Sequence, residues 1–416
     1  MRLRKWDAYR VYLILSGLSS LFFMLIFTLN LVYEAQVVGL TPLQLVLVGT
    51  TVETTCFLFE IPTGIVADLY SRRLSVIIGF LLIGIGFTIE GAFPFFGAVL
   101  LNQVIWGIGS TFTSGALDAW IIDEVGEARM GVVLLRGSQA GQIGGVAGVI
   151  VSVILGSVAL ALPVVVGGLL FVALTVFLVF VMPETNFHPT PRGERSTWQS
   201  MRHTLTESIR LIRLRPTLLT LAAVTLVLGL YSEGYDRLWQ AHLLRDFTLP
   251  ALDSLSPVVW FGIINIVTML LAALANEIVR RRLNMNQQRA LAAVLIAAHA
   301  AMVAALLILA LAVNLWLALI GLLIMGTLRS TSAPILSTWT NQHIDSNVRA
   351  TMLSSFGQLN AVGQIGGGPF VGAIGDRWGL RAALSVAAIL LSPVIWLIAR
   401  GSRQVVAADA EVVTAE

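Results

Sequence analysis

Apolar runs long enough to cross a lipid bilayer recur along this sequence from one end to the other. A helix that spans the hydrocarbon core needs about 20 mostly apolar residues. Charged residues make up only 12% of the chain, against about 25% in soluble proteins, so most of the chain must be surrounded by lipid or by apolar helices. The sequence predicts an all-α integral membrane protein with twelve transmembrane helices, at roughly 10–33, 42–68, 74–93, 96–121, 131–157, 160–182, 217–243, 255–279, 288–313, 315–341, 350–375 and 379–399.

One interruption between these spans, at residues 183–215, is much longer than the others. It begins as a polar, proline-containing segment. Its second part places apolar residues at helical spacing, at Met201, Leu205, Ile209 and Ile212. We interpret it as a cytoplasmic linker with an amphipathic surface helix. It divides the chain into a six-helix half at 1–182 and a second six-helix half at 216–400, and we expect residues 401–416 to form a disordered cytoplasmic tail.

The distribution of basic residues tests this count of spans. If the N-terminus is inside and the spans alternate, 21 of the 26 Lys and Arg residues fall in inside segments. Only Arg245, Arg377 and Arg381 fall outside, and Arg237 and Arg329 remain within spans. Cytoplasmic loops are enriched in Lys and Arg. The sequence therefore predicts that both termini and the linker are cytoplasmic, in a membrane of the bacterial inner-membrane type.

Short motifs recur in the same order in the two halves. The matches have offsets of 222, 219 and 209 residues, and they join residues 141–145 with 363–367, Gly107 and Trp120 with Gly326 and Trp339, and residues 68–74 with 277–283. Collinear matches of this kind indicate a parallel duplication of a six-helix unit. Two parallel halves, related by an axis along the membrane normal, suit transport by alternating access.

Motifs typical of enzymes are missing from the sequence. Lys5 is the only lysine, so the chain has no Walker A loop, which needs a lysine to hold phosphates. No G-x-S-x-G or H-E-x-x-H motif occurs. The five histidines are far apart and Cys56 is the only cysteine, which gives no spacing for a metal site. We predict no enzymatic activity, no metal, no cofactor and no nucleic-acid partner.

Residues 64–73 carry a recognisable loop motif, Gly-Ile-Val-Ala-Asp-Leu-Tyr-Ser-Arg-Arg. It resembles the signature of the major facilitator superfamily, Gly-x-x-x-Asp followed by Arg-Arg or Arg-Lys, and it lies between the second and third spans, as in that family. The resemblance implies a latch on the inside, formed by Gly64, Asp68, Arg72 and Arg73. Asp68 can meet helix N-termini or arginines of the neighbouring half when the protein closes. The alternative is that Arg72 and Arg73 only determine the topology.

Residues 59–64 and 232–239 resemble the branch of this family that holds tetracycline and macrolide efflux proteins. That branch implies proton-coupled export of amphipathic drugs or toxic metabolites. The chain departs from many proton antiporters of the family, which carry an Arg four residues before a Gly on the fourth span. Gln103 takes that position before Gly107. The alternative function is an importer or uniporter of a small solute on the same fold.

Several ionisable side chains lie inside the predicted spans. A charge at the bilayer centre costs about 2.5–3.5 kcal/mol on insertion scales, so these residues mark candidates for a central polar or proton-coupling site: Glu53, Glu233, Asp236, Arg237 and Arg329. Glu233 and Arg237 are four residues apart and can pair along their helix. No Arg or Lys lies within two turns of Glu53 on its span. We predict Glu53 as the proton carrier and Glu233–Arg237 as a gate, the alternative being static ion pairs that fix the helices.

Neutral polar and aromatic side chains within the spans are candidates for lining a substrate cavity. By depth these are Asn30, Asn102, Gln103, Gln139, Trp239, Asn265 and Gln358. The alternative is that each makes a polar contact between packed helices. We expect the partners of the protein to be a small-molecule substrate, protons and the lipid bilayer, and we expect the protein to be a monomer.

Overall fold

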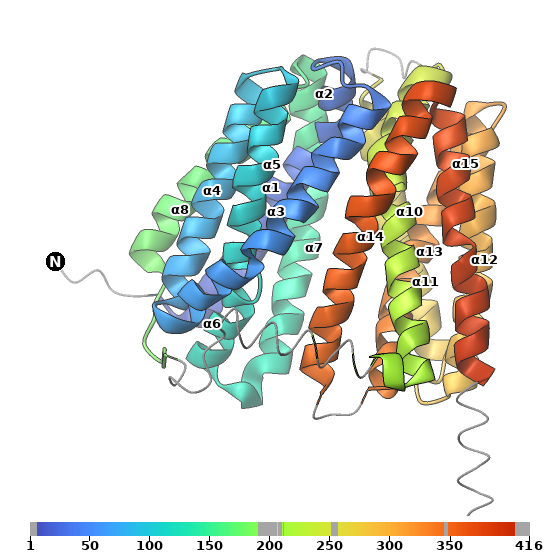
Figure 1. Cartoon of the computed structure of the whole chain (residues 1–416). Helices are drawn as coiled ribbons and strands as arrows, with labels where there is room; N and C mark the ends of the chain where they lie inside the picture. Colours follow the sequence, from blue (N-terminus) through green and yellow to red (C-terminus); the bar gives the residue numbers. More distant parts are fainter. Residues whose placement is uncertain are drawn as a thin grey trace, which may run out of the picture. The chain divides into compact units, whose positions relative to one another are not determined.

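The computed structural model describes residues 6–189, 206, 210, 212–250, 257–344 and 348–403. Every regular element among these residues is an α-helix, as the sequence predicts (Figure 1). The bounds are α1 (Ala8–Phe27), α2 (Asn30–Gln36), α3 (Pro42–Leu69), α4 (Arg72–Ala92), α5 (Phe96–Thr113), α6 (Ala116–Val125), α7 (Glu127–Val158), α8 (Leu162–Val181), α10 (Pro216–Asp246), α11 (Val259–Arg282), α12 (Gln288–Leu311), α13 (Leu315–Gln342), α14 (Arg349–Trp378) and α15 (Leu380–Leu391).

Ten helical segments in the described part of the chain are long and apolar enough to cross a membrane. One of them combines α1 and α2, and another extends α15 to Arg403. The two further predicted spans correspond to α5 and α14, which are long but more polar. α5 has 18 residues and carries Asn102 and Gln103, and α14 has 30 residues and carries several glycines and amides. The prediction of an all-α integral membrane protein is confirmed.

The ends of the helices follow signals that are visible in the sequence. Pro42 begins α3, where the missing N–H of proline costs no hydrogen bond. Ser71 caps α4, because its Oγ accepts a hydrogen bond of 2.9 Å from the backbone N–H of Leu74. Gly126 and Gly379 have φ angles of 81° and 87°, which glycine adopts without steric cost. These two glycines let α7 and α15 start directly after the preceding helices.

The helices cluster in two compact units. The first comprises Met1–Leu40, Thr51–Trp198 and Pro250–Asn265, and the second comprises Thr41–Thr50, Gln199–Leu249 and Ile266–Glu416. Helices α3 and α11 therefore each contribute to both units. The predicted linker helix and the predicted tail at 401–416 fall for the most part outside the described residues, and the division at 183–215 stays a prediction.

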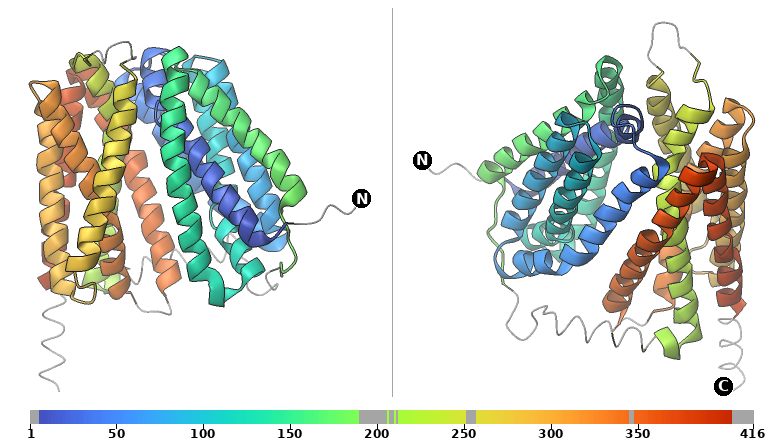
Figure 2. Two further views of the ribbon diagram at one scale, coloured as in Figure 1. Left: turned by 180° about the vertical axis from the view of Figure 1, so that it is seen from behind. Right: turned by 45° about the horizontal axis from the view of Figure 1, so that its top comes forward.

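The two units repeat the same helix pairings. In the first, α1 packs on α7 and α8, and α4 packs on α5 and α8. In the second, α10 packs on α14 and α15, and α12 packs on α13 and α15. These helices can be followed in Figures 1 and 2. The correspondence is the one expected of a parallel duplication.

Glycines of the duplicated motif explain why the corresponding helices approach so closely. A Cβ atom added at Gly144 would lie 2.9 Å from the carbonyl carbon of Gly17, between α7 and α1. One added at Gly367 would lie 2.6 Å from Cα of Leu230, between α14 and α10. Both distances are too short for a real contact, so each position requires glycine. The motifs at 141–145 and 363–367 thus have the same packing role in each unit.

Aromatic and aliphatic side chains fill the interior of each unit. In the first, Phe171 of α8 lies at the centre of an aromatic cluster, with ring centroids 5.4 Å from Phe22 and 5.7 Å from Phe80. In the second, Met302 and Trp339 are each only 1% exposed. The polar groups described below therefore stand out against an apolar interior.

Candidate functional site

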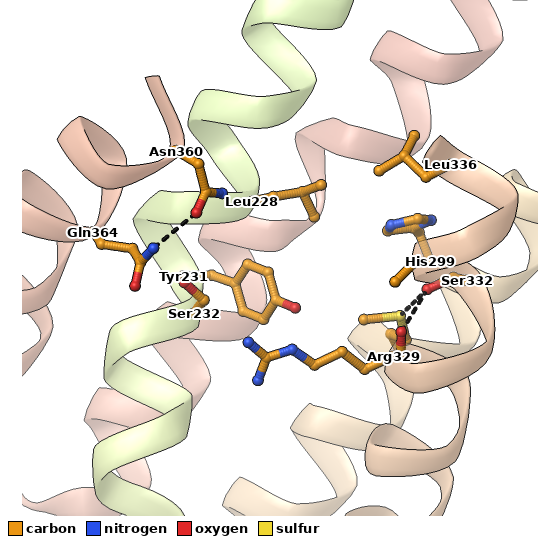
Figure 3. A pocket seen from close by; sticks show the side chains of 11 residues that line it. Leu228, Tyr231, Ser232, His299, Arg329, Ser332, Leu336, Asn360 and Gln364 are labelled. Carbon is orange, nitrogen blue, oxygen red and sulfur yellow. Dashed lines mark hydrogen bonds between the residues drawn. The ribbon is translucent and has the colours of Figure 1, made fainter. Parts of the chain in front are cut away.

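A cavity of about 180 Å³ lies within the second unit (Figure 3). Four helices supply its wall: α10, α12, α13 and α14. Its apolar lining consists of Leu228, Met302, Ala333 and Leu336. Its polar lining consists of Tyr231, Ser232, His299, Arg329, Ser332, Asn360 and Gln364. Each of the four helices contributes at least one polar side chain, so the cavity can bind a polar molecule from several directions.

Two amides from α14 are held in fixed orientations at one side of the cavity. Gln364 donates from Nε2 to Oδ1 of Asn360 at 2.7 Å, and Asn360 donates from Nδ2 to the carbonyl of Thr225 at 3.2 Å. Figure 3 shows the first of these bonds as a dashed line. The carbonyl oxygen of an amide only accepts, and Oε1 of Gln364 has no hydrogen-bond partner among the described residues.

His299 of α12 presents an acceptor on another side. Its Nδ1 lies 2.8 Å from the carbonyl of Leu295, one turn earlier, and the ring is 1% exposed. A carbonyl only accepts, so Nδ1 donates, and Nε2 of the neutral ring keeps its lone pair. Within the described part of the chain, Nε2 has no hydrogen-bond partner. Ser332 lies nearby, with Oγ 3.3 Å from the carbonyl of Arg329 and 3.8 Å from Sδ of Met302.

Arg329 lines the cavity and also forms an ion pair with Asp236. Its Nη2 donates to Oδ2 of Asp236 at 2.8 Å, and its Nη1 donates to Oδ1 of the same carboxylate. This two-pronged geometry is the strongest arrangement of an Arg and a carboxylate. The guanidinium carbon also lies 6.0 Å and 5.7 Å from the ring centroids of Tyr231 and Tyr235, within the range of cation–π attraction. The two rings and the carboxylate together fix the position of Arg329.

A second ion pair follows on α10. Arg237 donates from Nε to Oε1 of Glu233 at 2.9 Å, and the Glu233 side chain is 5% exposed. The pairing predicted from the four-residue spacing is therefore present. A Cβ atom at Gly49 would overlap the Glu233 carboxylate and lie 2.6 Å from Nε of Arg237, and one at Gly368 would lie 3.1 Å from Cγ of Glu233. Glycines on α3 and α14 thus provide the space for this pair.

Asp376, near the end of α14, caps the N-terminus of α3. Its Oδ1 accepts from the backbone N–H of Leu43 at 3.0 Å, and its Oδ2 accepts from Oγ1 of Thr41 at 3.1 Å. Thr41 and Gln44 also form a capping box, with bonds of 3.3 Å and 3.0 Å. A carboxylate at a helix N-terminus interacts favourably with the helix dipole. This contact joins residues that are far apart in the sequence, and sequence analysis did not find it.

The basic residues of the predicted latch bind within the first unit. Arg72 forms an ion pair with Asp123 and donates to the carbonyl of Ala119 at 2.9 Å. The backbone N–H of Arg73 donates to Oε1 of Glu184 at 2.9 Å. These bonds attach the start of α4 to α6 and to the segment after α8, so both residues already have structural roles.

Asp68 and Gly64, the other two residues of the predicted latch, do not have comparable contacts. Asp68 is partly buried, and it forms no hydrogen bond or ion pair with residues that the structure describes. A Cβ atom at Gly64 would meet nothing within 4 Å, so packing does not explain this glycine. The function of the four residues as a latch stays a prediction.

None of the seven residues predicted to line a substrate cavity belongs to the described wall of the cavity in Figure 3. Three of them bind buried carboxylates in the first unit instead. Asn102 donates to Oε2 of Glu90, Gln103 lies 3.5 Å from the same atom, and Asn30 donates to Oε1 of Glu34 at 2.7 Å. Gln103, at the position of the antiporter arginine, thus contacts an acidic side chain.

The other four residues predicted to line a substrate cavity differ in their contacts and exposure. Asn265 donates to the carbonyl of Phe261, one turn earlier, at 2.8 Å. Gln139 is exposed, and Trp239 and Gln358 are partly buried. For these residues a role at the substrate stays a prediction.

Glu53 lies on α3, in the part that belongs to the first unit. It follows Gly49 by four residues and therefore lies on the same face of the helix, one turn further along. Its side chain is partly buried. Its role as proton carrier stays a prediction.

Sequence analysis missed most of the polar wall of the cavity, namely Tyr231, Ser232, His299, Ser332, Asn360 and Gln364. One signal was available for Gln364, which lies within the duplicated Gly-Gln-Ile-Gly-Gly motif. His299 and Asn360 carried none, because a single polar residue on an apolar helix shows its depth but not the helix that it faces.

Membrane-length helices in two units with the same internal pairings define a polytopic membrane protein. The family model of the Major Facilitator Superfamily matches residues 12–368. The chain belongs to this superfamily. The resemblance seen in the loop motif at 64–73 is confirmed at this level, and the protein is a membrane transporter.

Related proteins cover nearly the whole chain. An uncharacterised transporter of the same superfamily from Bacillus subtilis (strain 168), YxaM, is 22% identical over 357 residues, which are 85% of this chain and 86% of YxaM. A crystal structure of a mutant of the nucleoside transporter NupG has a TM-score of 0.79 at 14% identity and covers 95% of this chain and 100% of its own. A bacterial homologue of the human lysosomal transporter Spinster has a TM-score of 0.72 at 16% identity, covering 96% and 98%. At these identities the structural likeness shows the fold alone.

Proposed function

We propose that the protein is a secondary active transporter that couples solute movement to protons, and that Asp236 and Arg329 form the coupling pair. The observation that carries this proposal is the double role of Arg329. It lines the cavity of the second unit and, through both terminal nitrogens, binds the carboxylate of Asp236. A solute in the cavity and a proton on Asp236 therefore act on the same guanidinium.

The coupling works through the charge of Asp236. A proton on this carboxylate removes the negative charge that holds Arg329, and the guanidinium can then donate towards the cavity. The binding of solute and the binding of a proton thereby change each other's free energy, and by linkage the effect is reciprocal. Alternating access requires that solute and proton bind one conformation better than the other. In this proposal the Arg329–Asp236 bond forms in one of these conformations and opens in the other.

Glu233 and Arg237 have a different role in this proposal. Their side chains are only 5% and 14% exposed, and removing one partner of a buried pair leaves an uncompensated charge. We assign them to a gate or to structural support on α10. Glu53, one turn after Gly49, is the second candidate for the proton carrier.

The size of the cavity bears on the substrate. Sites for drug-sized ligands have volumes of about 300–1,000 Å³, whereas this cavity has about 180 Å³. It therefore favours the transport of a small solute. Structural relatives of this fold include proteins described as nucleoside and peptide transporters. Export of amphipathic drugs is the second candidate, supported by the likeness of residues 59–64 and 232–239 to the efflux branch.

The location and topology belong to the same proposal. We place the protein in a membrane of the bacterial inner-membrane type as a monomer, with both termini in the cytoplasm. The support for the topology is the distribution of 21 of the 26 Lys and Arg residues on one side of the predicted spans.

Proteoliposomes with an imposed pH gradient test the proposed function. Labelled neutral and amphipathic solutes are added outside two sets of vesicles. In one set the interior is more acidic than the outside, and in the other it is more alkaline. We expect at least one solute to accumulate above its equilibrium level only while the gradient lasts, and the direction of the effective gradient distinguishes import from export. Equilibration that does not respond to the gradient would identify a uniporter and refute coupling.

A further inference from the structure

We infer that the cavity of Figure 3 binds a small, uncharged solute that carries several hydroxyl groups, of the size of a monosaccharide or cyclitol. The inference rests on the proposed function for its role in transport. Its basis is the chemistry of the cavity wall. Three properties of that wall lead to it: charge, hydrogen-bonding capacity and size.

The charge of the wall disfavours ionic ligands. Among the described residues of the lining, Arg329 is the one arginine, and none carries a carboxylate. The positive charge of Arg329 is compensated by Asp236 through two hydrogen bonds. A charged ligand needs a partner of opposite charge wherever it leaves water, because an unpaired charge is costly away from water. An amphipathic cation would find no carboxylate in the described part of the wall.

The hydrogen-bonding groups of the wall match hydroxyl groups. Oε1 of Gln364 and Nε2 of the neutral His299 only accept, and neither has a partner among the described residues. The hydroxyl of Tyr231 can donate or accept. A ligand must therefore donate at two places and accept or donate at a third. Hydroxyl groups do both, so a molecule with several of them can satisfy all three sides at once.

The size and the apolar lining of the cavity further restrict the chemical class of the ligand. The volume of about 180 Å³ is below the range of about 300–1,000 Å³ that is typical of sites for drug-sized ligands. Met302, Leu336 and Leu228 provide apolar surface between the polar groups. A compact ring with hydroxyls at its edge and C–H groups on its faces fits this alternation, whereas a long or flat amphipathic drug does not.

The test measures binding without any gradient. Purified protein in nanodiscs is heated in the presence of millimolar D-xylose, D-glucose, myo-inositol or the lipophilic cation tetraphenylphosphonium. A ligand that binds only the folded protein raises the unfolding midpoint in proportion to ln(1 + [L]/Kd). We expect a shift with at least one of the three neutral compounds and none with the cation.

Two variants locate the binding. Gln364→Leu removes an acceptor from the wall and is expected to weaken the affinity at least tenfold. Gln142→Leu, the exposed counterpart of Gln364 in the first unit's copy of the motif, is expected to bind as the wild type does. Ser332→Ala serves as a second wall variant in case Gln364→Leu does not fold.

Each result decides for or against the inference. No shift with any neutral compound means that the cavity holds only water, and a shift with tetraphenylphosphonium alone would support a drug site instead. Wild-type affinity in both wall variants would place the binding elsewhere. The binding test uses no gradient, so it is independent of the coupling. If a neutral solute binds but its transport in proteoliposomes does not respond to the pH gradient, the inference about the cavity holds and the proposed coupling is wrong. Transport of an amphipathic drug driven by the pH gradient would support the proposed coupling and contradict the inference of a neutral polyhydroxyl solute.

Discussion

Arg329 of α13 binds Asp236 of α10 through both carboxylate oxygens, while the same guanidinium lies against the rings of Tyr231 and Tyr235. The two charged residues are 93 positions apart in the chain. Because Arg329 also lines the cavity, a change in the charge of Asp236 reaches the cavity through a single side chain. The predictions concern this pair and the helices that position it.

Replacing Arg329 by lysine tests whether geometry or charge alone is required. Lysine keeps the positive charge, but it cannot form the two-pronged bond or stack on both tyrosines. We expect Arg329→Lys to fold normally and to lower the initial rate of gradient-driven uptake at least tenfold. Arg245→Lys, at the end of α10, is the matched control and should transport normally. Equal rates in both variants would mean that only the charge matters.

Gly49 is expected to tolerate no side chain. A Cβ atom there would overlap the Glu233 carboxylate and lie 2.6 Å from Nε of Arg237, so Gly49→Ala must displace this ion pair. Overpacking of this kind costs about 1–3 kcal/mol, which should lower the thermal unfolding midpoint in detergent. Gly366→Ala is the control, since its Cβ atom would meet nothing within 4 Å. An unchanged midpoint for Gly49→Ala would contradict the packing described here.

Arg237→Ala is expected to reduce the amount of folded protein. It leaves the Glu233 carboxylate, which is 5% exposed, without the arginine that pairs with it. Breaking a buried pair in this way costs about 3–5 kcal/mol. The double variant Glu233→Leu with Arg237→Leu removes both charges and should recover most of the folded yield, measured by size-exclusion chromatography. A double variant as poor as Arg237→Ala would show that the arginine has other essential contacts.

Asp376→Ala is expected to loosen the start of α3. It removes the acceptor for the backbone N–H of Leu43 and for Oγ1 of Thr41, and the loss of a helix cap costs about 0.5–2 kcal/mol. Amide hydrogen exchange at residues 43–46 should accelerate, while exchange in α12 should not change. Asp376→Asn keeps an acceptor and should show a smaller effect. Exchange at the wild-type rate in Asp376→Ala would mean that the capping box of Thr41 and Gln44 suffices.

The sequence predicts the helices well and their mutual contacts poorly. Runs of apolar residues and the proline and glycine signals locate the spans, because these are properties of one segment. The Glu233–Arg237 pair is also predictable, since both residues belong to one helix. The bond of Asp376 to the start of α3 is not, because the spacing within one helix does not show which faces of different helices meet.

The duplication gave one route from sequence to tertiary contact. The shared motif at 141–145 and 363–367 predicted equivalent helices, and its glycines mark close approaches of α7 to α1 and of α14 to α10. The duplication did not predict the cavity. Its wall includes Tyr231, His299 and Asn360, which come from different helices and share no motif.

The central claim is that Asp236 carries the proton that drives transport, and one comparison tests it most directly. Asp236→Asn and Glu53→Gln are each reconstituted, and uphill uptake driven by a pH gradient is measured beside solute exchange at equal pH. Asparagine cannot take part in the proton cycle, so Asp236→Asn is expected to lose uphill uptake and to keep measurable exchange, while Glu53→Gln keeps both. If Asp236→Asn still concentrates the solute with an unchanged dependence on the gradient, the claim is wrong. Loss of uphill uptake in Glu53→Gln alone would assign the proton to Glu53.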